Sequence, residues 1–300
     1  VQYMDHAPMH PAFCFTKGLF RSLQNGGRDT ALDVSGRYKG FNFEMTLRFT
    51  GPAMLDVTDM MVFCALCQQA ALPEAFRIGE NHRSRQVAEA GFRRSGGAWR
   101  VPYVIACTSY TALVKGAGLT ATGSNTDAIK ASLQRLAATT VQVTHVNGMC
   151  GRQEMAESLI AIFQTKEGLK IALNSVASTV LTDTSKGVCW VNMRELRMLK
   201  SKPARRLHVM LCAWASSKSL KLIQETNLAA HIYGGEPEGA SQKKERLRTV
   251  RAATQEIAKL PGWVCGVDRP GMMKVRNPVF KGTPAICPET ANPVNLETAA

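Results

Sequence analysis

The chain has 300 residues, 45% of them hydrophobic, and a formal net charge of +14, of which +12 lies between residues 186 and 281. This length suffices for two modules with sizeable cores, and a charge so concentrated favours a polyanionic partner, although a solvated basic surface would have the same composition. No stretch approaches the ~20 uninterrupted apolar residues of a membrane span, and the first thirty residues lack a secretion signal. We therefore exclude a membrane-spanning or secreted protein and expect a cytoplasmic one with no membrane partner.

The first part of the chain is predicted to contain an N-terminal arm at residues 1–36 and a first module at 37–177. Apolar residues alternate with polar ones from Phe41 to Phe49. This period of two is typical of a strand with one buried face. The first module therefore begins with a strand.

A capped helix is predicted to follow this strand. Asp56 or Thr58 provides its N-cap, apolar residues recur at helical spacing, and the helix ends before Pro73. Residues 73–98 are polar and rich in glycine and arginine, which favours a loop or an insertion. The alternation at 99–105 then predicts a second, shorter strand.

Two helices joined by a glycine-containing turn are predicted at 110–115 and 127–138, and this order is a helix-turn-helix pattern. In the second helix Ile129, Leu133 and Leu136 form one apolar stripe, which leaves the opposite face polar and available to bases. The candidate DNA-contacting residues of this module are Ser124, Asn125, Lys130, Gln134 and Arg135.

A hairpin is predicted after this helix pair. Apolar and polar residues alternate into Asn147-Gly148, a dipeptide that favours a tight turn, and strands follow near 160–164 and 169–173. A helix-turn-helix followed by a hairpin is a winged helix. The first module is therefore predicted to be one.

The same order of elements is predicted to recur in a second module at 178–281. Helices are expected at 203–214, 226–233 and 241–260, with Ser241 as the cap of the last, and strands at 263–267 and 272–276. The predicted fold is thus α+β, with tandem winged-helix domains. Residues 282–300 contain three prolines and little to bury, so a disordered tail is expected there.

The helix at 241–260 carries the most concentrated positive charge. Leu247, Val250 and Ile257 share one apolar face, so the opposite side is expected to point away from the core. Arginine, lysine, glutamine and threonine on that side suit the edges of bases in a major groove, whereas Arg246 and Arg251 flank it and suit phosphates. A solvated amphipathic helix remains the alternative. The candidate DNA-contacting residues of this module are Ser241, Gln242, Lys243, Lys244, Arg246, Arg248, Thr249, Arg251, Lys274 and Arg276.

Several short segments recur in one known family. They are His6-Ala-Pro-Met-His10, Gly18-Leu-Phe-Arg-Ser-Leu23, Ala31-Leu-Asp-Val34, Ser109-Tyr-Thr-Ala-Leu113, Ala172-Leu-Asn174, Arg206-Leu-His208, Leu211-Cys-Ala-Trp214 and the stretch from Arg246 to Arg251. In order and spacing these segments resemble the IncQ-type plasmid replication initiators, the replication protein C family, over residues 5–278. The residues between His10 and Gly18 and the stretch at 73–98 depart from the family pattern.

The resemblance implies a bacterial, cytoplasmic initiator with tandem winged helices. Such a protein binds short direct repeats, iterons, in double-stranded origin DNA, helps to open the duplex and recruits the plasmid's helicase and primase. A homodimer is left open as a further partner. A winged-helix transcriptional repressor is the alternative function, because it would use the same DNA-binding face.

An enzyme, either a nicking initiator or a zinc-dependent one, is the other class considered. Cys64 and Cys67 have the spacing of a zinc knuckle but lack a second Cys/His pair, and prolines separate His6, His10 and Cys14. The chain contains no P-loop sequence and no defensible catalytic triad or carboxylate pair. We predict a protein that is not an enzyme, with no catalytic residues, no metal and no cofactor.

Overall fold

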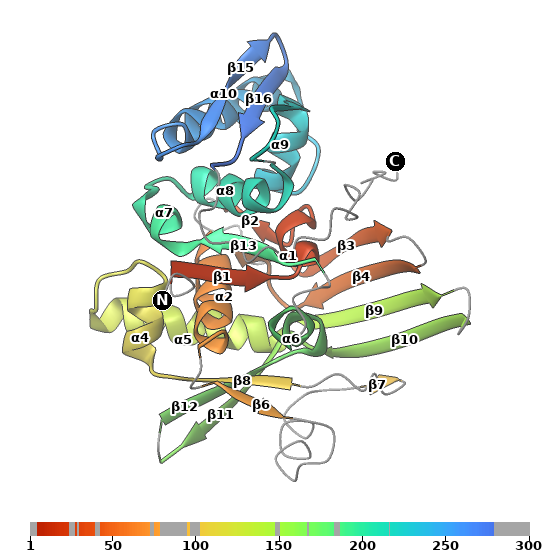
Figure 1. The fold of residues 1–300 in the computed structure, drawn as a ribbon, viewed down its shortest axis with the longest axis vertical. Helices are drawn as coiled ribbons and strands as arrows, with labels where there is room; N and C mark the ends of the chain where they lie inside the picture. The colour runs from red at the N-terminus through yellow and green to blue at the C-terminus, as the bar shows by residue number, and fades with distance from the viewer. Residues whose placement is uncertain are drawn as a thin grey trace.

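The computed structural model describes residues 5–23, 28, 30–39, 43–72, 75–78, 95–96, 103–147, 151–166, 168–182, 187–215 and 217–278. Within these residues helices and strands are mixed, which confirms the α+β class (Figure 1). The tail predicted at 282–300 and most of the loop predicted at 73–98 lie outside them. No helix of the described residues has the length and apolar character needed to cross a membrane.

The first half of the chain is organised around helix α2 (Val57–Ala70). Asp56 accepts hydrogen bonds from the backbone N–H groups of Thr58 and Asp59, and the Asp59 carboxylate accepts one from the N–H of Asp56, so the predicted cap is a complete capping box. The Phe63 ring packs 5.0 Å from that of Phe13. Helices α4 (Tyr110–Gly116) and α5 (Gly123–Ala138) pack against α2 and confirm the predicted helix pair.

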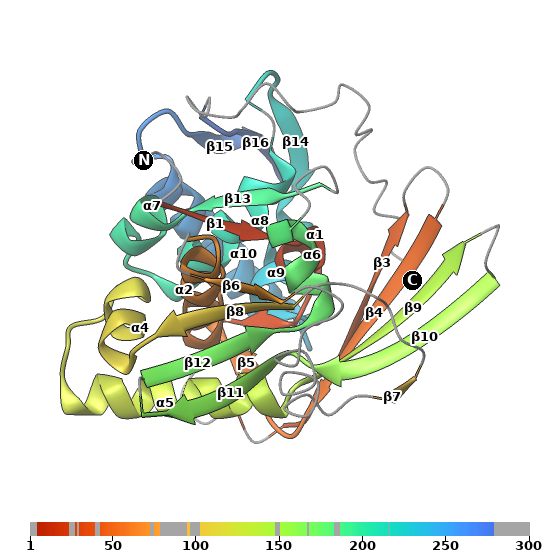
Figure 2. The ribbon, with the colours of Figure 1, turned by 60° about the horizontal axis from the view of Figure 1, so that its bottom comes forward.

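Two sheets complete this half. One has four strands in the order β11-β12-β8-β6, which are Ile160–Thr165, Gly168–Leu173, Tyr103–Thr108 and Phe76–Ile78. The other has five strands in the order β3-β4-β9-β10-β7, which are Leu32–Lys39, Phe43–Gly51, Thr140–Asn147, Gly151–Ser158 and Ser95–Gly96, and it projects to one side of the molecule (Figure 2). The hairpin predicted through Asn147 thus belongs to this projecting sheet, whereas β11 and β12 form the hairpin of the four-stranded sheet.

The second half contains helices α8 (Lys202–Trp214), α9 (Glu225–Tyr233) and α10 (Ala240–Ile257) and strands β14 (Lys221–Gln224), β15 (Val264–Arg269) and β16 (Met272–Arg276). The sheet order is β14-β16-β15. The three helices and the last two strands match the predicted elements, but β14 was not predicted. Ser241 does not cap α10, because the N-cap is Gly239 and makes no side-chain hydrogen bond to the helix.

Both halves contain the same succession of helix, strand, two helices and two strands. In the first half these elements are α2, β8, α4, α5, β11 and β12, and in the second they are α8, β14, α9, α10, β15 and β16. In each sheet the last of the three strands lies between the other two. In the first half β6 and β7 also stand between α2 and β8, and the β9–β10 hairpin stands between α5 and β11; the second half has no corresponding strands among the described residues. We refer to these two sets as the first unit and the second unit.

Many residues between His6 and Arg21 are buried in the core. Strand β1 (His6–Met9) pairs with β13 (Cys189–Asn192), and β2 (Phe20–Arg21) pairs with β5 (Leu55–Asp56). The chain between them forms helix α1 (Pro11–Phe15), and the side chains of Ala12, Phe13 and Leu19 are fully buried. The expected arm at 1–36 is therefore corrected for residues 6–21: β1, α1 and β2 lie between the two halves (Figure 1), and their buried apolar side chains belong to the core.

Arg206 of α8 ties this N-terminal segment to the second unit. Its guanidinium is fully buried and donates hydrogen bonds to the main-chain carbonyls of Cys14 at 2.9 Å, Thr16 at 3.3 Å and Phe20 at 3.0 Å. Burial lowers the pKa of Arg206 to about 10, so the side chain stays protonated at neutral pH. A buried charge held only by carbonyls couples α8 to the N-terminal segment.

Cys64 and Cys67 are both buried in α2, and burial raises the pKa of each thiol, so both are neutral thiols at neutral pH. His6 lies in β1, whereas His10 is the N-cap of α1 and accepts a hydrogen bond from the N–H of Ala12. Across the part of the chain that the structure describes, no group of three His, Cys, Asp or Glu side chains is arranged to hold a metal ion.

A buried histidine gives the second half a pH-dependent stability. His208 of α8 lies 2.9 Å from Glu195 of helix α7 (Met193–Met198), and the Trp263 indole donates to the same carboxylate oxygen. Burial alone would lower the pKa of His208, but Cys212 and the hydrogen-bonded Glu195 outweigh it and raise the pKa to about 9. The network therefore stabilises the fold fully below pH ~6.5, and this contribution is lost as the pH rises through about 9.

We expect the free energy of unfolding, measured by urea titration, to fall between pH 6.5 and 9. In the Glu195→Gln variant the histidine loses its carboxylate partner, so the same titrations should give a flatter profile across that range. Equal pH dependence in the two proteins would show that this pair does not govern the effect.

Candidate nucleic-acid interface

Helix α10 is held to the second unit by one apolar side. Val250, Ala253 and Ile257 are buried in the same core as Leu207 and Met273. Thr254 is also buried, and its hydroxyl donates a hydrogen bond to the carbonyl of Val250 in the same helix. At ~100° per residue, this fixes the side chains that point away from the core. They are Ser241, Lys244, Glu245, Arg248 and Arg251, and all are exposed.

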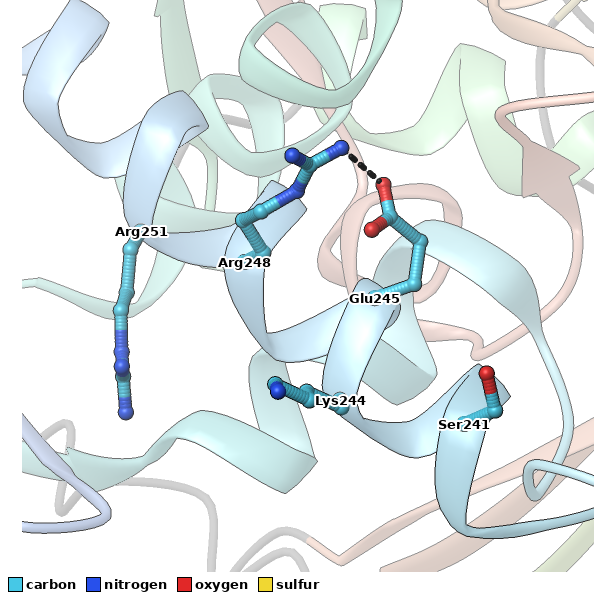
Figure 3. Close-up of a pocket in the computed structure, with 5 residues that line it drawn as sticks. All are labelled: Ser241, Lys244, Glu245, Arg248 and Arg251. Atoms are coloured by element: carbon cyan, nitrogen blue, oxygen red, sulfur yellow. Dashed lines mark hydrogen bonds and ion pairs between the residues drawn. The ribbon is translucent and has the colours of Figure 1, made fainter.

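These five exposed residues line an open hollow of about 450 Å³ on the outer face of α10 (Figure 3). Arg248 is 79% exposed and pairs with Glu245 at 2.8 Å, one helical turn before it. An exposed pair of this kind contributes little to stability, so Arg248 can exchange Glu245 for another acceptor at low cost. Lys244 lies on the same face and is exposed. The face offers two cations that are not needed to hold the fold together.

Arg251 is oriented by a buried acid that was not predicted. Its Nε and Nη2 donate to the two carboxylate oxygens of Glu225, both at 2.9 Å, and Glu225 is only 1% exposed. The N–H of Glu225 also donates to the carbonyl of Gly271, in the turn between β15 and β16. Glu225 thus connects α9, α10 and the β15–β16 hairpin. The pair with Glu225 raises the pKa of Arg251 and leaves its third nitrogen for an outside partner.

Two of the predicted DNA-contacting side chains near the start of α10 instead make contacts within the protein. Arg246 lies 4.8 Å from the centre of the Tyr233 ring and donates to the carbonyl of Gly235. Gln242 accepts a hydrogen bond from the N–H of Glu238. These side chains shape the loop between α9 and α10, while Lys243 is exposed and Thr249 is half-buried.

In helix α5, too, some of the predicted DNA-contacting side chains are exposed and others form hydrogen bonds within the protein. Ser124 and Gln134 are exposed, and Lys130 is exposed while pairing with Asp127 at 3.1 Å. The Asn125 side-chain amide donates to the carbonyl of Thr120, which fixes the turn before the helix.

Arg135 does not lie on the outer face of α5. Its guanidinium donates to the fully buried carboxylate of Asp59 in α2, at 2.7 Å for the closest pair, and only 17% of the Arg135 side chain is exposed. Ser132 donates to the same carboxylate at 2.6 Å. The expected place of Arg135 on the outer face of α5 is corrected accordingly, because this side chain fastens α5 to α2.

Lys274 and Arg276 are separated from the outer face of α10. In β16 they alternate with Met273 and Val275, which are buried in the core that also receives α10. Lys274 lies opposite Leu222 of β14 and Gly266 of β15, on the solvent side of the sheet. The structure therefore places these two cations and the α10 cations on different sides of the sheet.

The geometry defines an α+β protein with two units of the same element order, the second of which presents a basic helix to solvent. The model of the replication protein C (RepC) family matches residues 1–276, and the chain belongs to this family of plasmid replication initiators. The family is generally non-enzymatic. The resemblance found in the sequence is thereby confirmed.

The fold is similar to that of domains 2 and 3 of the protein RctB, in two crystal structures. The TM-scores are 0.48 and 0.46 with 10% sequence identity in each, over 87% and 85% of this chain and 95% and 93% of those chains. None of the curated protein sequences matches the chain.

Proposed function

We propose that the chain is a replication initiator that binds double-stranded origin DNA sequence-specifically through two winged-helix domains, at 37–177 and 178–281. In a winged helix the second helix of the pair enters the major groove and the hairpin lies beside it. Helices α5 and α10 occupy that place in the shared element order, and β11–β12 and β15–β16 occupy the place of the hairpins.

The observation that carries this proposal is the outer face of α10. Lys244 and Arg248 are exposed on it, and the opposite side of the same helix is buried in the core. Either cation can reach the O6 and N7 atoms of guanine, and Ser241 can reach several bases. Arg251, already oriented by Glu225, has one free nitrogen for a phosphate. In the first domain Ser124, Lys130 and Gln134 take the corresponding positions.

The bound sequence is proposed to be a set of short direct repeats, the iterons. Occupation of the repeats would help to open the duplex and bring in the plasmid helicase and primase, with a homodimer as a further assembly. Family membership supports this assignment over a transcriptional repressor, which would use the same helices. Plasmid maintenance separates the two, because only an initiator sustains replication of an origin plasmid supplied with helicase and primase.

Salt dependence of binding tests the DNA interface directly. If about six phosphates are neutralised, the logarithm of the association constant should fall against the logarithm of salt concentration with a slope near −5, from ~0.9 per phosphate. Binding is measured on a duplex that footprinting identifies among origin repeats. A flat response, or equal affinity for the repeat and a scrambled duplex, would count against sequence-specific binding of DNA.

A further inference from the structure

The turn between α4 and α5 is held by an arginine of α7, the helix that immediately precedes α8. Gly118 has a φ of +72°, and a Cβ atom at this position would lie 2.8 Å from Cγ of Arg197. Arg197 belongs to α7 and donates to the carbonyl of Gly116 at 3.4 Å, while its other nitrogen lies 3.9 Å from Asp5. The stem of Arg197 therefore lies directly on the turn that positions α5.

The turn between α9 and α10 is held in the same manner from the opposite direction. Gly234 has a φ of +80°, and a Cβ atom there would lie 2.6 Å from Cα of Gly18 and 2.9 Å from Cζ of Arg21. The N–H of Ser22 donates to the carbonyl of Ile232 at 2.8 Å. Residues 18–22 thus lie against the end of α9, and the Arg21 guanidinium covers the glycine that starts the turn to α10.

The two contacts are reciprocal. Arg21 belongs to β2, which pairs with β5 immediately before α2, the first helix of the first unit. Arg197 belongs to α7, which immediately precedes α8, the first helix of the second unit. Each arginine is therefore fixed beside the first helix of one unit and contacts the turn of the other. We call these two contacts the arginine clasps.

We propose that Arg21 and Arg197 are positioning residues that set the permitted spacing between the two DNA segments read by α5 and α10. The inference rests on the proposed function. The clasps act on the two turns that aim these helices, and the buried contacts of Arg206 and the β1–β13 pairing hold the same two halves together. With both turns fixed, α5 and α10 cannot move independently.

A fixed separation matters because duplex DNA is helical. About 10–10.5 base pairs complete one turn, so each inserted base pair rotates the second segment by roughly 35° and shifts it along the axis by about 3.4 Å. Two rigidly connected readers cannot both follow this change, and the advantage of simultaneous binding is lost. That advantage amounts to roughly 100-fold or more in affinity for linked sites.

The test measures affinity for duplexes that differ only in spacing. A site selected from random duplexes by the wild-type chain is compared with the same site carrying one or two extra base pairs between its two contacted segments. We expect the wild-type affinity to fall about 100-fold on insertion, and that of the Arg21→Ala/Arg197→Ala variant to fall less than about tenfold. Each single variant retains one clasp and should lie between these limits.

Two controls separate positioning from general destabilisation. Arg205→Ala removes an arginine that donates to the carbonyl of Leu199 within the second half, so it should leave the spacing preference unchanged. Arg21→Lys and Arg197→Lys keep the stem and a donor, and should restore most of the preference. Thermal unfolding of every variant shows whether a loss of stability accompanies the change, and the single variants serve if the double variant does not fold.

The possible results distinguish this inference from the function on which it rests. Wild-type chain that binds no duplex selectively would overturn the proposed function. Selective wild-type binding, with the same penalty for inserted base pairs in the wild type and in the folded clasp variants, would overturn the role of Arg21 and Arg197 alone.

Discussion

The Arg206→Ala variant is expected to lose a large part of its free energy of unfolding. Removing the guanidinium takes one donor away from each of the buried carbonyls of Cys14, Thr16 and Phe20 and opens a cavity beside α8. Each buried carbonyl that loses its donor costs about 1–3 kcal/mol, so the sum is several kcal/mol against a total of about 5–15 kcal/mol for a typical domain. The loss should be larger than at any exposed arginine, because Arg206 is fully buried.

Urea titration of the Arg206→Ala and Arg205→Ala variants measures the difference. Arg205 is adjacent in the sequence but only partly buried, and its side chain donates to one carbonyl and lies near the Glu256 carboxylate, so its removal should cost about 1 kcal/mol. If the Arg206→Ala variant unfolded at the same urea concentration as the wild type, this would contradict the structural role assigned to the side chain. Hydrogen exchange should also show early opening of residues 12–21 in the variant, because their anchor is lost.

Local sequence patterns were sufficient for elements whose packing follows from their own periodicity. Helices α8 and α10 have apolar residues at helical spacing, and the strands of the β15–β16 hairpin surround a Pro-Gly turn. Strand β14 has only four residues with alternating partial exposure, so its signal is weak. Strand β1 is recognisable as a strand only through its pairing with β13, about 180 residues later, and no local pattern records that partner.

The same limit explains which candidate side chains are exposed, as expected, and which are not. Projection on a helix shows the direction in which a side chain leaves the backbone, and this sufficed for Lys244 and Arg248. It does not show whether an acidic side chain from a distant part of the sequence lies close to that side chain. Arg135 meets Asp59, and Arg251 meets Glu225, in each case a buried carboxylate from another helix. In both cases the acid lies in the first turn of a preceding helix, and this position in the sequence could have indicated a possible partner for the arginine.

The Lys244→Ala/Arg248→Ala variant is expected to retain its fold and lose sequence-specific binding. Both side chains are exposed and neither is required for packing, so the free energy of unfolding should change by less than about 1 kcal/mol. Each specific base contact contributes about 1–3 kcal/mol, so removing both should weaken binding to the cognate duplex on the order of 100-fold. Binding to a scrambled duplex should weaken far less. Fluorescence anisotropy on the two duplexes at fixed salt provides both values.

Two comparisons assign this loss to base contacts. Arg37→Ala/Arg48→Ala removes the same charge from exposed positions on the projecting five-stranded sheet, so it should leave the ratio of cognate to scrambled affinity unchanged. Arg251→Ala should weaken both duplexes alike and also lower stability, because Glu225 then remains buried without its partner. If Lys244→Ala/Arg248→Ala instead weakened both duplexes equally, these side chains would contact phosphates, and the bases would have to be read from another face of the molecule.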